Sequence, residues 1–443
     1  MTDSIIIRNG TILTMDKESH YYTDRALVIE GNKIKKILPE NSSEINTCTG
    51  TEINAEGMLV MPGFINAHMH SNLVRGFGDD AKLYKWHKEI AETVGLELTP
   101  EEAYTGALLA YMEAIRSGTT TIAAMEKYCV HCYKAALKSG IRARITPYVL
   151  DFPDCLDTVG LNTEYVRKTY RPGERVKFWF GFDSFREAGE SMIKEIAALS
   201  EKYNVPMQTH CSESVDDVKL CKERFGKTPV EYLDSLGVLT NRMLLAHAVH
   251  LNEKERALVK QRGARVAHCC ISNMKLCDGI APVCDYIERG IPVGLGTDGA
   301  NSNNNYDMFE EMKAAALLQR ISTDRADALK ACDVLRLATA GGAAVLDIEN
   351  ETGSLEPGKA ADIILVDMRK LHFAPYDTKY ASIIKSHLVF SASGADVDTS
   401  IIDGRIVMRN RKFTEIDEAK LLYDANLQGR SLIERLVKKG LRL

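Results

Sequence analysis

Short apolar runs separated by turn residues mark both ends of the chain. Near the N-terminus these runs are Ser4–Arg8, Thr11–Met15, Arg25–Glu30 and Lys33–Leu38. Asn9-Gly10 and Gly31-Asn32 lie between them, and dipeptides of this kind connect the paired strands of β-hairpins. The same texture returns at 361–367 (ADIILVD) and 400–408 (SIIDGRIVM). We therefore predict a small β-sandwich domain to which both chain ends contribute.

The middle of the chain alternates strand-like apolar runs with segments of helical periodicity. The strand-like runs are Leu59–His70, Thr119–Met125, Ala143–Leu150, Val176–Ser184, Pro206–Glu213, Met243–Val249, Arg265–Cys270 and Pro292–Asp298. Helical segments between them include Pro100–Ser117, Glu190–Tyr203 and Glu253–Arg262. Repeated strand–helix units are typical of a parallel sheet. Eight of them predict an α/β fold, a TIM-like (β/α)8 barrel.

The change of texture along the chain predicts four segments. Residues 1–57 form the first part of the β-sandwich domain and 58–357 the barrel. Residues 358–414 complete the β-sandwich domain, and 415–443 form a C-terminal helix that packs across the outside. A chain of 443 residues exceeds one ordinary core, so a large barrel with a smaller domain also suits its length.

Composition limits the partners and the compartment. A hydrophobic share of 45% with 26% charged residues is that of a globular protein, and a net charge of −5 gives no reason to expect nucleic acid or a membrane as partner. The first residues lack the basic and apolar regions of a signal peptide, and no window approaches the ~20 apolar residues of a membrane span. The cysteines number 11, without a disulfide framework. We expect a cytoplasmic protein that forms a homo-oligomer.

Metal-binding and acid–base side chains recur at the ends of the predicted barrel strands. His68 and His70, two positions apart on one strand, face the same side. The later strand ends carry His210 with Glu213, then His247, then Asp298. Any one of these histidines could be an ordinary buried residue. Their recurrence at the end of the barrel where such folds place catalysis predicts a metal site, because neutral imidazole binds Zn and Fe well.

These residues and their flanking sequences resemble those of the amidohydrolase superfamily. His-x-His after strand one, histidines on strands five and six and an aspartate after strand eight form its pattern. The segments 246–251 (AHAVHL), 271–283 (ISNMKLCDGIAPV) and 294–312 (GLGTDGANSNNNYDMFEEM) are similar to the branch of S-adenosylhomocysteine/methylthioadenosine deaminases and triazine hydrolases. Residues 353–367 (GSLEPGKAADIILVD) resemble the superfamily's return into its small β domain. The resemblance spans nearly the whole chain.

The resemblance and the chemistry of the side chains imply the same roles. His68, His70, His210 and Asp298 would hold one divalent ion, and we expect Zn, with Fe and Mn as the alternatives. Such an ion lowers the pKa of a bound water from about 15.7 towards about 7. Asp298 could take the proton of that water, and Glu213 would carry a proton to the substrate and to the leaving amine. His247 would form a hydrogen bond with the water or polarise the oxygen of the tetrahedral intermediate.

The predicted fourth strand argues for one metal ion. Two-metal members of the superfamily bridge their ions with a carboxylated lysine near the end of that strand. Here the strand ends in 180–184 (FGFDS), and Lys177 lies at its start. We therefore expect a mononuclear site and not hydantoinase-like chemistry.

The loop after strand one departs from the nucleoside deaminases of that branch. Those enzymes hold the ribose hydroxyls with a glutamate in this loop. Alignment through Trp86, which we predict to contact substrate, places Gly95 at that position, with Glu92 and Glu97 close by. The ribose contact is then missing.

At two further positions, which bear on recognition of the heterocycle, this chain differs from the nucleoside deaminases. Pro147 stands where those deaminases carry an arginine, and Asp183 where they carry a histidine. We predict that Asp183 accepts hydrogen bonds from ring N–H or amino groups, with a helix N-cap as the alternative. Ser302 could also face the substrate, with an Asn-rich turn as the simpler alternative.

We therefore predict a metal-dependent deaminase that releases ammonia from an amino-substituted nitrogen heterocycle. A purine base, pterin, pyrimidine or triazine is the expected ring. One alternative is an adenosine-type nucleoside such as S-adenosylhomocysteine or methylthioadenosine. Others are displacement of chloride or alkylamine from a triazine, and a barrel that binds metal or ligand without turnover. Glu213 with His247 favours deamination, because an amine must be protonated to leave.

Overall fold

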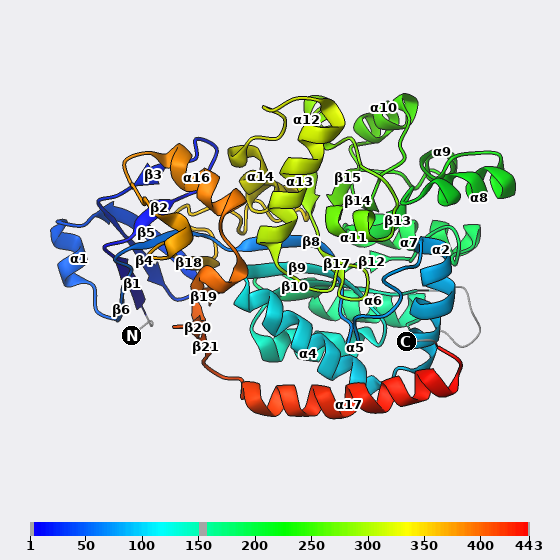
Figure 1. Cartoon of the computed structure of the whole chain (residues 1–443), viewed down its shortest axis with the longest axis horizontal. Helices are drawn as coiled ribbons and strands as arrows, with labels where there is room; N and C mark the ends of the chain where they lie inside the picture. Colours follow the sequence, from blue (N-terminus) through cyan, green and yellow to red (C-terminus); the bar gives the residue numbers. More distant parts are fainter. Residues whose placement is uncertain (1–3, 150–156, 442–443) are drawn as a thin grey trace.

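A closed ring of parallel strands forms the centre of the computed structural model, which describes residues 4–149 and 157–441 (Figure 1). The ring strands are β8 (Phe64–His70), β9 (Thr119–Glu126), β10 (Arg142–Pro147), β11 (Val176–Phe178), β12 (Phe180–Gly181), β13 (Met207–Cys211), β14 (Met243–His247), β15 (Arg265–His268), β16 (Val293–Leu295) and β17 (Asp298–Gly299). They pair in the orders β11-β10-β9-β8-β17 and β12-β13-β14-β15-β16. Within the described residues β11 with β12 and β16 with β17 each fill one position, which confirms the eight-stranded barrel.

The first predicted strand, Leu59–His70, is wrong as a single element. The structure divides it into β7 (Met58–Pro62), which pairs with the small domain, and β8, which enters the barrel. The break falls at Gly63, where a β-carbon would lie 2.1 Å from Thr120 of β9. Only a residue without a side chain lets the backbone pass this close. The third run ends earlier than predicted, at Pro147, and its last residue, Leu150, lies outside the described residues.

Helices surround the ring and cover its apolar outer face (Figure 1). They are α4 (Pro100–Arg116), α5 (Cys129–Ser139), α6 (Val159–Thr169), α7 (Glu190–Tyr203), α8 (Val215–Phe225), α9 (Pro229–Ser235), α10 (Glu253–Arg262), α11 (Cys270–Lys275), α12 (Val283–Glu288), α13 (Met308–Thr323), α14 (Ala331–Leu337) and α15 (Ala340–Val345). Capping boxes define several starts: Thr99 with Glu102 at α4, and Asn252 with Glu255 at α10. The three helical segments named from the sequence are thus confirmed.

Two sheets from both chain ends pack beside the barrel. One has the order β5-β4-β1-β6 and the other β21-β20-β19-β18-β7-β2-β3. Their strands are β1 (Ser4–Arg8), β2 (Thr11–Leu13), β3 (Tyr21–Tyr22), β4 (Arg25–Glu30), β5 (Lys33–Pro39), β6 (Thr51–Asn54), β18 (Ile363–Asp367), β19 (Val397–Ile402), β20 (Arg405–Arg409) and β21 (Lys412–Phe413). Ile7 and Ile29 of the first sheet share a core with Val60 and Ile363 of the second. This is the predicted β-sheet domain, although its residue boundaries stay a prediction.

The last helix, α17 (Glu418–Lys438), runs along the outside beneath α4, far from the β-sheet domain at its C-terminal end (Figure 1). Arg435 Nη2 lies 2.7 Å from Glu102 Oε2 of α4, and Arg116 pairs with Glu418 at 2.5 Å. The helix therefore braces the outer layer of the barrel. No helix in the described part of the chain combines the length and the apolar character needed to cross a membrane.

Candidate active site

Five predicted side chains meet at the C-terminal ends of the barrel strands. His68 and His70 come from β8, His210 from β13, His247 from β14 and Asp298 from β17. The ring centroid of His68 lies 4.8 Å from that of His70 and 4.9 Å from that of His210. The ring centroids of His210 and His247 are 5.5 Å apart. The structure thus brings together the residues that the sequence placed at four separate strand ends.

The two histidines of β8 have their outer ring nitrogens bonded to oxygen. His68 Nδ1 donates to Gln208 Oε1 at 3.2 Å, and His70 Nδ1 donates to the carbonyl of Met125 at 2.7 Å. A donor at Nδ1 leaves Nε2 as the bare, metal-binding nitrogen of a neutral ring. Met69 between them is fully buried, as the alternation of the strand predicts.

His210 and His247 are oriented in the same way. His210 Nδ1 donates to the carbonyl of Asp183 at 2.9 Å, and His247 Nδ1 donates to Asn273 Oδ1 at 2.8 Å. Each ring therefore presents Nε2 to the interior of the site. Outer hydrogen bonds that set the tautomer of an imidazole are typical of metal-ligating histidines.

The inner nitrogens are arranged as a cation would require. His70 Nε2 lies 3.1 Å from His210 Nε2, although both Nδ1 atoms already carry the proton of a neutral ring. The Nε2 atoms of His68 and His247 are buried without a hydrogen-bond partner in the described part of the chain. Asp298 Oδ1 lies 3.4 Å from His70 Nε2 and 3.7 Å from His68 Nε2. Lone pairs facing one another across so short a distance fit a metal ion held between them.

Asp298 is held by two hydroxyl groups. Its Oδ2 accepts from Ser272 Oγ at 2.6 Å and from Ser302 Oγ at 2.7 Å, which leaves Oδ1 to the histidines. Its backbone has φ +61°, an unusual conformation that aims the carboxylate inward. Ser302 is therefore engaged with Asp298, and its predicted contact with substrate stays a prediction.

The charges of the site favour neutral His68, His70 and His247 beside an ionised Asp298. Burial lowers the pKa of His68 and His70, and it lowers the pKa of His247 to about 4. Burial would raise the pKa of Asp298, but the surrounding imidazoles outweigh it and lower that pKa. At His210 burial is outweighed by Asp183, and the pKa rises to about 9. Three of the rings are thus neutral near neutral pH, and a bound cation would displace the proton of His210.

Glu213 stands directly beside this set. It is buried at the start of α8, and its Oε1 lies 3.5 Å from His247 Nε2. Its backbone N–H donates to Asp217 Oδ2 at 3.1 Å, and Asp217 also completes the capping box of α8 with Ser214. Burial raises the pKa of Glu213 to about 8. The carboxyl group can therefore carry a proton near neutral pH, as a general acid must.

Asp183 lies behind the histidines, at the end of the fourth strand position. Its Oδ1 is 3.3 Å from His210 Nδ1, its Oδ2 accepts from Ser184 Oγ at 2.9 Å, and Arg186 Nη2 is 3.6 Å away. The N-cap alternative is wrong, because α7 begins after Gly189. The observed contacts orient His210, and the predicted contact with the heterocycle stays a prediction.

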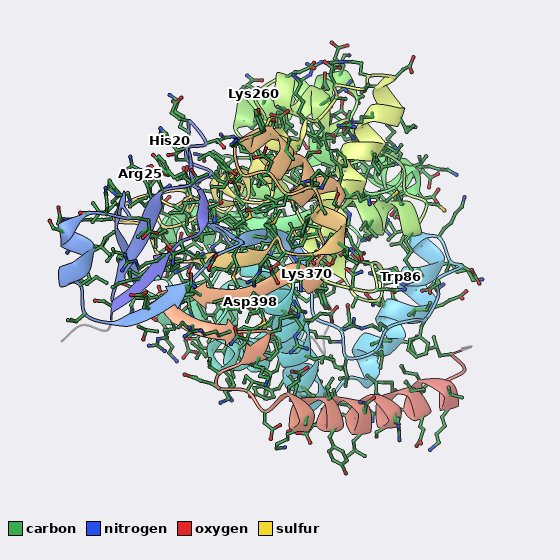
Figure 2. The ribbon with its side chains drawn as sticks, turned by 60° about the vertical axis from the view of Figure 1, so that its left-hand side comes forward. His20, Arg25, Trp86, Lys260, Lys370 and Asp398 are labelled. Atoms are coloured by element: carbon green, nitrogen blue, oxygen red, sulfur yellow. The ribbon has the colours of Figure 1, made fainter. Side chains whose placement is uncertain are left out.

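Trp86 ends α2 (Leu83–Trp86), which Figure 2 places on the opposite side of the molecule from Arg25 of the N-terminal sheet. It is buried among apolar side chains that include Leu276 from the loop after α11. Its indole Nε1 has no hydrogen-bond partner among the described residues. A buried donor without a partner suits a substrate contact, and the predicted contact of Trp86 with substrate stays a prediction.

Sequence reasoning missed the residues that orient the ligands. Gln208 precedes His210 by two positions on one strand, so the alternation of the strand could have identified it. Asn273 lies 26 residues after its partner His247, on another element, and no spacing rule connects them. Arg186 was missed as well. Its Nη1 donates to Asp217 Oδ1 at 2.7 Å, which connects the loops after strands four and five.

Asn273→Ala is expected to lower kcat by about 10–100-fold while the metal stays bound, because His247 loses the bond that sets its tautomer. Asn273→Asp still accepts from Nδ1 and should retain more activity than the alanine variant. Steady-state kinetics with elemental analysis measures both effects, and Asn426→Ala on the exposed face of α17 is the control. Equal losses in the alanine and aspartate variants would contradict this role.

Comparison with known proteins gives consistent matches over the whole length. The model of the amidohydrolase family matches residues 59–407. A 5-methylthioadenosine/S-adenosylhomocysteine deaminase of Pelotomaculum thermopropionicum is 37% identical over 436 residues, covering 98% of this chain and 99% of the relative. A 5'-deoxyadenosine deaminase of Methanosarcina mazei is 37% identical over 441 residues, covering 98% and 99%. An adenosine deaminase from Xanthomonas campestris, solved with bound zinc, superposes with a TM-score of 0.92 at 27% identity and 99% coverage of both chains.

Proposed function

The chain belongs to the amidohydrolase family, and on this premise we propose that it deaminates an aminopurine nucleoside, replacing the amino group with oxygen and releasing ammonia. It is a metal-dependent hydrolase of carbon–nitrogen bonds in cyclic amidines. The observation that carries this proposal is the buried carboxyl group of Glu213 beside the convergent histidines and Asp298. Such a pairing of a metal site with a proton carrier is what deamination requires.

The relatives narrow the substrate to the nucleoside alternative. Relatives that match nearly the whole chain are named for methylthioadenosine, S-adenosylhomocysteine and 5'-deoxyadenosine. We therefore propose an adenosine derivative changed at the 5' position, ahead of the free bases, pterins, pyrimidines and triazines expected first from the sequence. Deamination itself, the reaction predicted from the sequence, is unchanged.

We propose that His68, His70, His210 and Asp298 hold one zinc ion. The bare Nε2 atoms and the free Oδ1 of Asp298 supply the nitrogen and oxygen ligands that zinc takes, and the solved relative from Xanthomonas campestris contains zinc. His247 lies close enough to belong to the same donor cluster. The ion would supply the Lewis acidity that makes water nucleophilic near neutral pH.

The chain's own residues move the protons. Asp298 accepts a proton from the attacking water as the new bond forms between oxygen and C6 of the purine. His247, neutral and with its Nδ1 bonded to Asn273, accepts a hydrogen bond from that water at Nε2. Glu213 gives its proton to ring N1, takes the proton of the hydroxyl group formed at C6 and passes it to the amine. The C6–N bond breaks, ammonia leaves with the oxo-purine as the other product, and the proton held by Asp298 returns to Glu213.

A screen for ammonia release tests this proposal. We expect the highest kcat/KM for 5'-deoxyadenosine, methylthioadenosine, S-adenosylhomocysteine or adenosine, against guanine, pterins, pyrimidines and aminotriazines. Chloride release from a chlorotriazine without ammonia from any nucleoside would support the displacement alternative, and absence of turnover on every ring would support a binding protein. Cytoplasmic location and homo-oligomeric assembly stay predictions.

A further inference from the structure

Asp278, in the loop after α11, is a buried carboxyl group without a partner. The residue is 5% exposed, and its Oδ2 has no hydrogen-bond partner within the described residues. Its backbone is held on both sides: its N–H donates to the carbonyl of Asn273 at 2.8 Å, and His250 Nε2 donates to its carbonyl. The backbone of Asp278 is therefore fixed next to Asn273, the residue that orients His247.

The charges that act on Asp278 are those of the catalytic groups. Burial first, and then the carboxylates of Glu213, Asp217 and Asp298, raise the pKa of Asp278 to about 9, with Arg186 opposing. Arg186 is committed elsewhere, since its Nη1 donates to Asp217 and its Nη2 lies 3.6 Å from Asp183. Asp278 thus lies within the influence of the active-site charges, and its Oδ2 lacks a donor among the residues that the structure describes. A buried polar group without a hydrogen-bond partner is rare and destabilising, so its presence here requires an explanation.

The substrate offers few donors that could satisfy this carboxyl group. In an adenine nucleoside the ring atoms N1, N3 and N7 accept hydrogen bonds, and the exocyclic amine is the group that reacts. The remaining donors are hydroxyl groups of the sugar. In 5'-deoxyadenosine these are the 2'- and 3'-hydroxyls alone. A carboxyl group has two oxygens that can pair with two neighbouring hydroxyls, which donate and accept in either of its protonation states.

We propose that Asp278 binds the 2',3'-diol of the sugar and makes the enzyme select ribonucleosides over their deoxy analogues. This inference rests on the proposed function, because a substrate without a sugar has no diol. The loop of Asp278 adjoins α2, since Leu276 packs in the same apolar cluster as Trp86. The indole N–H of Trp86 and the Oδ2 of Asp278 are both buried without a hydrogen-bond partner among the described residues.

The two other carboxylates near the first barrel loop are less suited to this role. Glu97 Oε1 lies 3.4 Å from Lys439 Nζ, and its other oxygen lies 3.8 Å from Arg435 Nε. Glu92 is 54% exposed and faces His87 Nδ1 at 3.5 Å. Gly95 between them carries no side chain, and its carbonyl accepts from Lys127 Nζ at 2.6 Å. Compared with these two carboxylates, Asp278 is buried, and its Oδ2 has no hydrogen-bond partner in the described ranges 4–149 and 157–441.

The test compares kcat/KM for adenosine and 2',3'-dideoxyadenosine in the zinc-loaded wild type and in variants. We expect the wild type to prefer adenosine by at least about 10²-fold, because dideoxyadenosine leaves the buried carboxyl group of Asp278 unpaired, and a site built around substrate hydroxyls rejects an analogue that lacks them. Asp278→Ala should lose this preference, mainly through a higher KM for adenosine, with dideoxyadenosine changed by only a few-fold. Asp278→Asn, nearly the same shape, should lose part of it. Asp79→Asn, an exposed carboxylate paired with Lys275, is the control.

Equal losses on both substrates in Asp278→Ala and Asp278→Asn would overturn the inference, as would a wild type without preference. A preference abolished by Glu92→Gln and kept in the Asp278 variants would assign the diol to Glu92 and also overturn it. If the wild type releases ammonia from neither nucleoside, the proposed function fails and this inference fails with it. Ammonia from adenosine without dependence on Asp278 overturns the inference alone.

Discussion

His210→Ala is expected to remove the bound metal and with it the activity. His210 Nε2 lies 3.1 Å from His70 Nε2, and the carbonyl of Asp183 directs it into the site. Alanine deletes this nitrogen and leaves three donors around a solvent-filled gap. Loss of an outer hydrogen-bond partner typically costs about 10–100-fold in metal affinity or activity, and loss of a ligand itself should exceed that.

Elemental analysis of the purified variant, together with kcat for ammonia release, measures both effects. His20→Ala is the matched control, because this exposed histidine lies near Arg25 of the N-terminal sheet, on the opposite side of the view from Trp86 (Figure 2). A His210→Ala protein that keeps a full complement of metal would show that His210 is not a ligand.

Glu213→Gln is expected to keep the metal and lose about 10²–10⁴-fold in kcat, the range typical of a general acid–base group. Glutamine has nearly the same shape and can still form hydrogen bonds, but it cannot transfer a proton. Asp183 contacts the outer nitrogen, Nδ1, of the predicted metal ligand His210, whereas the carboxyl group of Glu213 lies on the inner side of the site. It stands beside His247 Nε2 at 3.5 Å, where the reacting atoms of the substrate would be.

The matched control is Glu223→Gln, an exposed carboxylate further along the same helix α8. We expect this variant to behave as the wild type. A Glu213→Gln protein that loses its metal, or that deaminates at the rate of the wild type, would contradict the assignment of Glu213 as the proton carrier.

Much of the barrel and its donor set could be predicted from the sequence, for physical reasons. Each barrel strand is buried on both faces and so reads as a continuous apolar run, and a parallel barrel brings the C-terminal ends of all strands to one side. His68 and His70 face the same way because side chains alternate along a strand. The division of the first run could not be predicted, because it depends on the contact between Gly63 and Thr120 of another strand.

The environment of each functional group could not be predicted from the sequence. Whether Asp183 is a substrate contact or the support of His210 depends on packing between β12 and β13, which residue spacing does not encode. Asp278 stands out only when its neighbours are known, since an aspartate in a loop is usually solvated. The substrate class came from relatives of similar length, because small changes in the loops select among heterocycles on one unchanged metal site.

Zinc titration of the metal-stripped protein, with ammonia release from 5'-deoxyadenosine as the readout, tests the central claim most directly. We expect no activity without metal and a rise to a plateau at about one ion per chain, as a single set of histidine and aspartate ligands requires. Full activity in the metal-free protein, or no ammonia at any zinc concentration, would contradict a metal-dependent nucleoside deaminase.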